Sequence, residues 1–158
     1  MNFKLFLENT EEYQKDLKNI LKNIPKGHAA LIKGYKIKFE PTNTLKNDSN
    51  HIGFIDEENK KIRIAAPWNY SRCFTVLHEI AHAVYKYKLD KKLKKEWKDI
   101  IKSTKEKQKE NTPEKCHSAL NQNAEELFCM AYASFYSKHS VNTYDNVNWK
   151  KFIEKIPN

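Results

Sequence analysis

The sequence FTVLHEIAHAVY at residues 74–85 places His78, Glu79 and His82 inside an otherwise apolar segment. The apolar positions follow the three- and four-residue spacing of one helix face, at Phe74, Leu77, Ala81 and Val84. An unpaired glutamate or histidine is costly to bury, so these polar residues need partners of their own. The segment therefore predicts a helix that packs against the core and carries a polar site.

Residues four apart lie on the same face of a helix, so His78 and His82 present two imidazoles to one point. Zinc binds such nitrogens at about 2.0–2.1 Å in a tetrahedral arrangement. Glu79 can take a proton from a water whose pKa the zinc lowers to about 7, and can pass it to a leaving amine. The HExxH pattern therefore predicts Zn²⁺ bound by both histidines, with Glu79 as the catalytic base.

A catalytic zinc takes a third protein ligand and keeps one position open. The extended pattern HExxHxxGxxH does not supply it here, because Tyr85 stands where that pattern has glycine and Lys88 stands where it has the third histidine. A later segment, NAEELFCMAYASFY, contains Glu125 and Glu126. Asn123 followed by Glu126 also fits a helix capping box, which is a competing role for that glutamate. We expect this segment to supply the third ligand, through Glu126 or Glu125, rather than only a helix cap.

The rest of the pattern indicates a single α+β domain over residues 1–158. Helical periodicity predicts helices at 11–24, 70–88, 90–110 and 123–136, and a last short helix that carries Trp149, Phe152 and Ile153. Apolar and polar residues alternate in the expected strands at 34–41, 52–55 and 62–66. The fold we expect has a small sheet, an active-site helix and C-terminal helices.

The last two strands form a predicted hairpin directly before the motif helix. We expect its second strand, KIRIAA, to lie at the edge of the sheet beside the active-site cleft. An extended peptide can hydrogen-bond to such an edge. This prediction makes Ile62 and Ile64 the substrate-binding residues.

Composition limits the other classes of function. The chain contains 3 glycines and no GxGxxG or GxxxxGK[ST] pattern, which argues against a nucleotide-binding loop. Three cysteines, Cys73, Cys116 and Cys129, match no CxxC spacing, so we expect reduced thiols, two of them in the core. The apolar segments are too short to span a membrane. We expect a monomer, with the cytoplasm as the default location.

The formal net charge is +9, and much of it comes from the lysine-rich segment 86–115. Such a run can attract nucleic acid or an acidic substrate, or it can be the solvated face of a helix. The run has one aromatic residue, Trp97, and almost no arginine, whereas nucleic-acid surfaces usually combine both. We therefore expect a solvated face and no specific nucleic-acid partner.

The segments TVLHEIAHAVY and EELFCMAYASFY together resemble the gluzincin peptidases of the anthrax lethal factor catalytic-domain type, a group that includes the clostridial Pro-Pro endopeptidases. The resemblance covers roughly residues 50–136. It implies a zincin-like fold and a zinc-dependent endopeptidase that cleaves a polypeptide. Position by position, it implies zinc ligation by His78, His82 and Glu126, with Glu79 as the base.

Two positions depart from the pattern of that family. Met130 stands where the family has a second glutamate, and Ala119 stands where it has a tyrosine that stabilises the oxyanion. His117 lies close to that position and could donate a hydrogen bond to an oxyanion instead. Three tyrosines are further candidates for the same role: Tyr132, Tyr136 and Tyr144.

The segment SRCFTVLHEIAH also resembles the ImmA/IrrE-type peptidases, which cleave repressors inside cells. The matching residues are Arg72, Phe74, Thr75, His78, Glu79 and His82. Both resemblances imply the same metal site and differ in the substrate. A third possibility is a zinc-bearing regulatory or binding domain of the same fold with little catalysis, which the departures at Ala119 and Met130 motivate.

Overall fold

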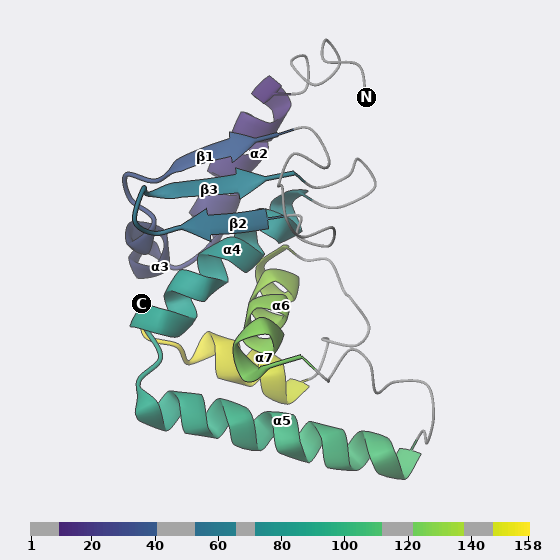
Figure 1. Ribbon diagram of the computed structural model, residues 1–158. Coiled ribbons are helices and arrows are strands. Elements are labelled where there is room, and N and C mark those ends of the chain that lie inside the picture. The colour runs from purple at the N-terminus through teal and green to yellow at the C-terminus, as the bar shows by residue number, and fades with distance from the viewer. Residues whose placement is uncertain (1–9, 41–52, 66–71, 112–121, 138–146) are drawn as a thin grey trace.

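The computed structural model describes residues 10–40, 53–65, 72–111, 122–137 and 147–158 (Figure 1). Along these ranges the elements are α2 (Thr10–Asn23), α3 (Lys26–Leu31), β1 (Lys36–Phe39), β2 (Gly53–Asp56), β3 (Lys61–Ile64), α4 (Arg72–Tyr87), α5 (Lys91–Asn111), α6 (Ala124–Ser137) and α7 (Val147–Glu154). This combination of helices and a small sheet confirms the α+β class. The short helix α3 was not predicted.

The three strands form one sheet in the order β1-β3-β2. β1 pairs parallel with β3, and β2 pairs antiparallel with β3 through a tight hairpin. The prediction that the second hairpin strand lies at the edge is therefore wrong, because β1 occupies its other side. Ile62 and Ile64 are 0% exposed and point into the helical layer, so they cannot bind a substrate. The edge strand beside α4 is β2.

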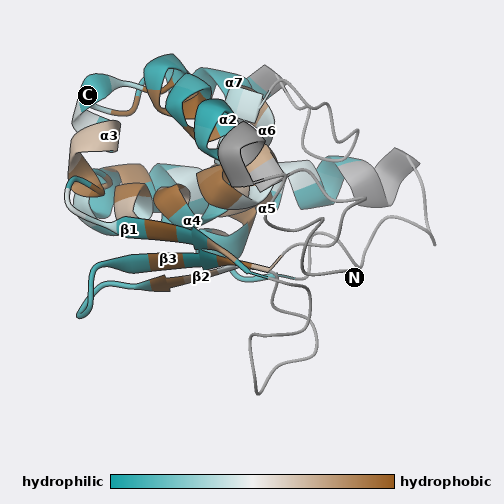
Figure 2. Cartoon of the chain, turned by 90° about the horizontal axis from the view of Figure 1, so that it is seen from above, coloured by the Kyte–Doolittle hydropathy of each residue, from teal (hydrophilic) through white to brown (hydrophobic). Residues whose placement is uncertain are grey.

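The helices gather on one side of the sheet, as the view from above shows (Figure 2). α4 packs directly against β2 and β3 and also contacts α2, α3 and α6. Its apolar stripe is buried as the sequence predicts at Leu77, Ala81 and Val84, while Phe74 is half-buried. A helix that is buried on most of its circumference can hold its few polar side chains in fixed positions.

α6 is the helix that packs most closely with α4, and seven of its residues are buried, from Leu127 to Ser134. The indole of Trp97 on α5 donates a hydrogen bond of 2.6 Å to the carbonyl oxygen of Ala124. Trp97 is 0% exposed and also meets Trp149 in an edge-to-face contact, with ring centroids 5.1 Å apart. The hydrogen bond from Trp97 to Ala124 holds the first turn of α6, where Glu125 and Glu126 lie.

Most of the described lysines of α5 are exposed, including Lys91, Lys92, Lys95, Lys98 and Lys102, whereas Lys94 and Lys105 are half-buried. None of the described helices is both long and apolar enough to cross a bilayer.

Candidate metal centre

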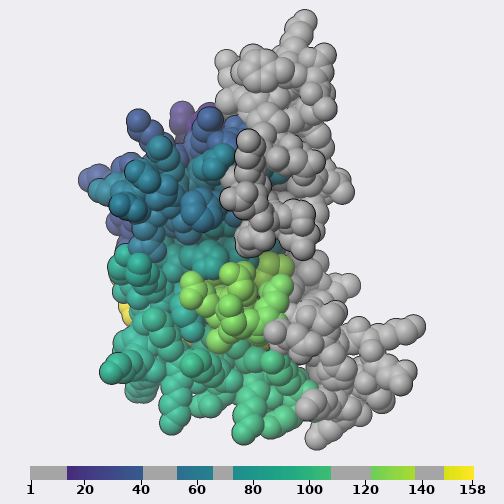
Figure 3. Space-filling model, in the orientation of Figure 1, coloured from purple at the N-terminus to yellow at the C-terminus, as the bar shows by residue number. Residues whose placement is uncertain are grey.

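Two histidines on α4 face the first turn of α6. The ring centroids of His78 and His82 are 5.2 Å apart, and the side chains are 16% and 21% exposed. They are one helical turn apart, so the i and i+4 spacing of the motif brings them together as predicted. On the face shown in Figure 3, α6 reaches the surface between α4 and α5.

The carboxylate of Glu126 contacts both histidines. One carboxylate oxygen lies 3.2 Å from Nε2 of His78, and the other lies 3.5 Å from Nε2 of His82. In a tetrahedral zinc site with bonds of 2.0–2.1 Å, neighbouring ligand atoms are about 3.3–3.4 Å apart. The two contacts, each made by a different oxygen of the Glu126 carboxylate, are close to that separation.

Glu125 contacts the opposite side of the His82 ring. Its carboxylate oxygen lies 2.8 Å from Nδ1 of His82. A neutral imidazole donates from only one nitrogen, so a hydrogen bond from Nδ1 to Glu125 leaves a lone pair on Nε2. Metal-ligating histidines are commonly held this way by an outer carboxylate. Glu125 is therefore better placed to orient His82 than to bind the metal itself.

The donor set also favours a cation on chemical grounds. Two carboxylates flank the His82 ring, one at each nitrogen, and a neutral ring can satisfy only one of them as a donor. A divalent cation beside Nε2 satisfies both the lone pair of His82 and the charge of Glu126. Imidazole nitrogens and carboxylate oxygens are both donor types that zinc takes in proteins.

The cap of α6 involves Asn123. Its side-chain oxygen accepts a hydrogen bond of 2.9 Å from the backbone nitrogen of Glu126. This bond satisfies one of the amide groups that a helix start leaves without an intrahelical partner. The two roles weighed for this segment are thus divided between two residues, since Asn123 caps the helix while the Glu126 carboxylate faces the histidines.

Glu79 lies on α4 under the edge strand and is 6% exposed. A Cβ atom placed on Gly53 of β2 would be 2.4 Å from Oε1 of Glu79 and 2.9 Å from Cγ2 of Thr75. Real Cβ atoms do not approach other atoms so closely. The absence of a side chain at Gly53 therefore makes room for the carboxylate of the predicted base.

A fourth potential ligand, which the sequence interpretation had placed only in the core, is Cys129. Its sulfur and one ring nitrogen from each of His78 and His82 all lie within 4.8 Å of one another. Burial raises the pKa of the Cys129 thiol well above its ordinary value, and the nearby carboxylates of Glu126 and Glu125 raise it further. The available signal was its position three residues after Glu126, on the same helix face.

The candidate oxyanion donors differ in whether the structure describes them and in how far they are buried. His117 and Tyr144 lie outside the described residues. Tyr132 is 0% exposed, and its hydroxyl lies 3.0 Å from Nδ1 of His28 in the core, so it is not available to a substrate. Tyr136 is half-buried and packs against Tyr132, with ring centroids 4.7 Å apart.

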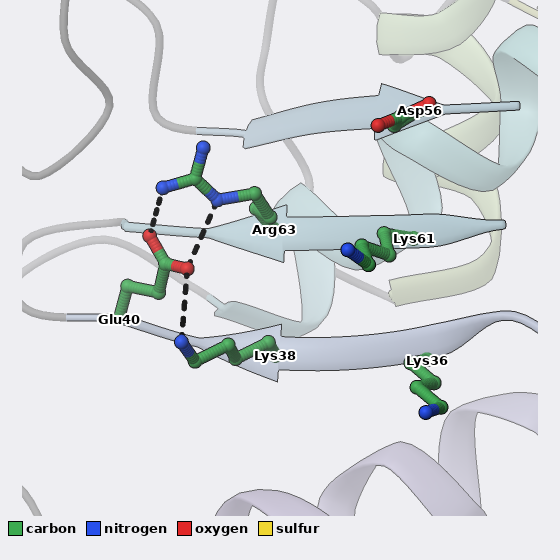
Figure 4. Close-up of a pocket in the computed structure, with 6 residues that line it drawn as sticks. All are labelled: Lys36, Lys38, Glu40, Asp56, Lys61 and Arg63. Atoms are coloured by element: carbon green, nitrogen blue, oxygen red, sulfur yellow. Dashed lines mark hydrogen bonds and ion pairs between the residues drawn. The ribbon is translucent and has the colours of Figure 1, made fainter. Parts of the chain in front are cut away.

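A second polar feature is a hollow of about 500 Å³ on the outer face of the sheet (Figure 4), lined by Lys36, Lys38, Glu40, Asp56, Lys61 and Arg63. The Arg63 guanidinium donates hydrogen bonds of 2.9 and 2.7 Å to the Glu40 carboxylate, which raises the pKa of Arg63. Lys36 lies directly opposite Lys61 in the register of β1 and β3. Like charges in such pairs are destabilising.

Comparison of the chain with family models, with curated proteins and with solved structures finds no match. The gluzincin resemblance therefore rests on the motif residues of the sequence.

Proposed function

We propose that this protein is a zinc-dependent endopeptidase of the gluzincin type. The observation that carries the proposal is the convergence of the Glu126 carboxylate on Nε2 of His78 and of His82, at 3.2 and 3.5 Å. Both histidines lie on α4 and the carboxylate lies on α6, so this arrangement depends on the packing of α4 against α6. Glu79 lies between the two histidines in the sequence, as the predicted base.

We also propose that the fold is zincin-like. Three features support this: a small mixed sheet, a motif helix packed beneath it, and a later helix that supplies a carboxylate. The edge strand of the sheet runs antiparallel to its neighbour and lies against the motif helix. The helices α5 and α7 support α6 from the far side through Trp97 and Trp149.

In this proposal the metal would be held by His78, His82 and Glu126. When bound, zinc acts as a Lewis acid that polarises a peptide carbonyl and lowers the pKa of a water molecule. The carboxylate of Glu79 accepts a proton from the attacking water and delivers it to the leaving amine. Glu125 keeps the His82 ring in the orientation that leaves Nε2 available.

The substrate in this proposal is an extended polypeptide that pairs with β2. Among the described strands, β2 pairs only with β3, and in this proposal its other edge forms the backbone hydrogen bonds to the substrate. Gly53 on this strand is in contact range of Glu79, so a peptide along β2 passes close to the base. β2 thus replaces Ile62 and Ile64 as the proposed substrate-binding element.

The test is the variant Glu79→Gln, compared with Glu58→Gln in the exposed hairpin turn as a matched control. Each protein is loaded with zinc, its zinc content is measured, and its cleavage of unfolded casein is followed. We expect Glu79→Gln to retain zinc and to lose cleavage, while Glu58→Gln behaves like the parent. Cleavage by Glu79→Gln at the parent rate would remove the proposed mechanism.

A second candidate function is a zinc-bearing binding or regulatory domain with little catalysis. It is favoured by Cys129, because a thiol beside the two histidines is a further donor to the metal. Structural zinc sites commonly have four protein ligands, whereas catalytic sites keep one position open. An ImmA/IrrE-type peptidase would use the same metal site on a different substrate.

A further inference from the structure

We infer that Cys129 is a fourth protein donor to the metal, which closes the coordination sphere in the resting state and makes activity depend on release of the thiolate. This inference rests on the proposed metal site of His78, His82 and Glu126. It concerns how that site is regulated, and it assigns a function to a cysteine that sequence patterning places in the core.

The first argument is the arrangement of the donors on two helices. His78 and His82 lie four residues apart on α4, and Glu126 and Cys129 lie three residues apart on α6. Both spacings place side chains on one face of a helix, and α4 and α6 pack closely against each other. Each helix therefore offers two donors to the space between them.

The second argument is distance. The sulfur of Cys129 and a ring nitrogen of each histidine lie within 4.8 Å of one another. In a tetrahedral site with Zn–N bonds of 2.0–2.1 Å and Zn–S bonds of 2.3 Å, nitrogen and sulfur are about 3.5 Å apart. Rotation of the two imidazoles about their side-chain torsions can close the remaining difference, which is at most about 1.3 Å.

The third argument is that the cysteine has little freedom to lie elsewhere. Cys129 is 0% exposed in the middle of α6, and its short side chain has one rotatable bond. The thiol is thus kept beside the histidines, whereas the Glu126 carboxylate, at 38% exposure, extends toward solvent.

The functional consequence concerns the open coordination position. A catalytic site keeps that position for water or substrate, and a fourth protein ligand occupies it. Cys129 and the reacting water therefore compete for one place. The chain has a closed state that binds zinc tightly and an open state that can act on a peptide. Removal of the thiol should weaken metal binding and increase turnover.

The experiment is titration of the full-length, metal-free chain with Co²⁺ under a thiol-free reductant, followed by absorbance spectroscopy. We expect visible bands of tetrahedral Co²⁺ and an intense near-ultraviolet band from thiolate-to-cobalt charge transfer. The variant Cys129→Ala should lose the charge-transfer band, keep the visible bands and bind Co²⁺ roughly tenfold more weakly or worse. Cys73→Ala and Cys116→Ala, as matched controls, should keep both kinds of band.

The outcomes separate this inference from the proposed function. Visible bands without a charge-transfer band in the parent would overturn the role of Cys129 and leave the metal site in place. A charge-transfer band that persists in Cys129→Ala would overturn it as well. Absence of all cobalt bands in the parent would instead contradict the proposed metal site. If Cys129→Ala fails to fold, Cys129→Ser keeps the side-chain volume, and it should lose the same band.

Discussion

The carboxylate of Glu79 occupies the space that a side chain on Gly53 would fill. The Cβ atom of any other residue at Gly53 would lie 2.4 Å from Oε1 of Glu79 and 3.0 Å from its Cδ. One residue belongs to the edge strand and the other to the motif helix. The position of the proposed base therefore depends on a glycine in a different element of the fold.

Gly53→Ala should displace Glu79 while leaving the metal ligands in place. A misplacement of a catalytic group by about 1 Å can reduce the rate by roughly 100-fold. We expect zinc content near that of the parent and casein cleavage reduced by about tenfold to 100-fold. Gly34→Ala is the matched control, because Gly34 has a φ of +86° and no atom near its Cβ position. It should lower stability without this loss of activity. Full activity in Gly53→Ala would show that Glu79 need not lie where it does.

Glu125→Gln tests the outer carboxylate that contacts Nδ1 of His82 at 2.8 Å. Loss of such a partner typically reduces metal affinity by about 10–100-fold. We therefore expect weaker zinc binding in competition with a chromophoric chelator, with the stoichiometry unchanged. Glu154→Gln, an exposed change on α7, serves as the control. Equal affinities in parent and Glu125→Gln would mean that this contact does not orient the ligand.

Lys36→Glu should stabilise the sheet. In the parent, Lys36 lies opposite Lys61 in the register of β1 and β3, and the variant replaces a like-charge pair with an unlike one. We expect the midpoint of thermal unfolding to rise by no more than about 4 °C at low salt, with a smaller rise in 1 M NaCl. Lys33→Glu makes the same change in net charge in an exposed turn and should lack this effect. A lower midpoint for Lys36→Glu would contradict the repulsion.

His28 should make stability depend on pH. It is 0% exposed, its Nε2 donates to the carbonyl oxygen of Pro157, and its Nδ1 accepts from the hydroxyl of Tyr132. Burial lowers the pKa of His28 below its ordinary value of 6.5, so the unfolded state takes up a proton first as the pH falls. The stabilisation from neutral His28 is complete above pH 6.5 and is lost below it.

Urea unfolding of the parent and of His28→Gln at pH 7.5 and 5.0 measures this effect. The parent should be the more stable protein at pH 7.5, and the difference between the two should shrink at pH 5.0. Tyr132→Phe keeps the imidazole and removes one partner, so it should be destabilised at both values while retaining the pH dependence. A difference between parent and His28→Gln that is the same at both pH values would contradict this interpretation.

The parts of the fold that follow from local sequence could be predicted. The apolar stripe of α4, the hairpin of β2 and β3, and the apolar α6 each follow from spacing within one segment. A carboxylate ligand from the segment of α6 was predicted from coordination chemistry rather than from periodicity, and the family resemblance pointed to Glu126. That prediction required the assumption that a zinc site lacks a third ligand.

The errors concern contacts between segments that are distant in the sequence. A hairpin does not reveal which of its strands a third strand will join, and β1 pairs with β3. For that reason the edge was assigned to the wrong strand, and Ile62 and Ile64 were placed at the surface. The position of Cys129 beside the histidines was also missed: its spacing from Glu126 was an available signal, but the contact depends on the rotation of α6 against α4. Periodicity in a helix that is apolar on most sides does not fix that rotation.

Zinc per chain, measured by elemental analysis of protein purified without added metal, tests the central claim most directly. The comparison uses the parent, Glu126→Ala and Glu58→Ala. The account predicts close to one zinc per chain in the parent and in Glu58→Ala, and much less in Glu126→Ala. A parent without zinc, which also fails to take it up on titration, would contradict the account and leave His78, His82 and Glu126 as a hydrogen-bonded polar cluster.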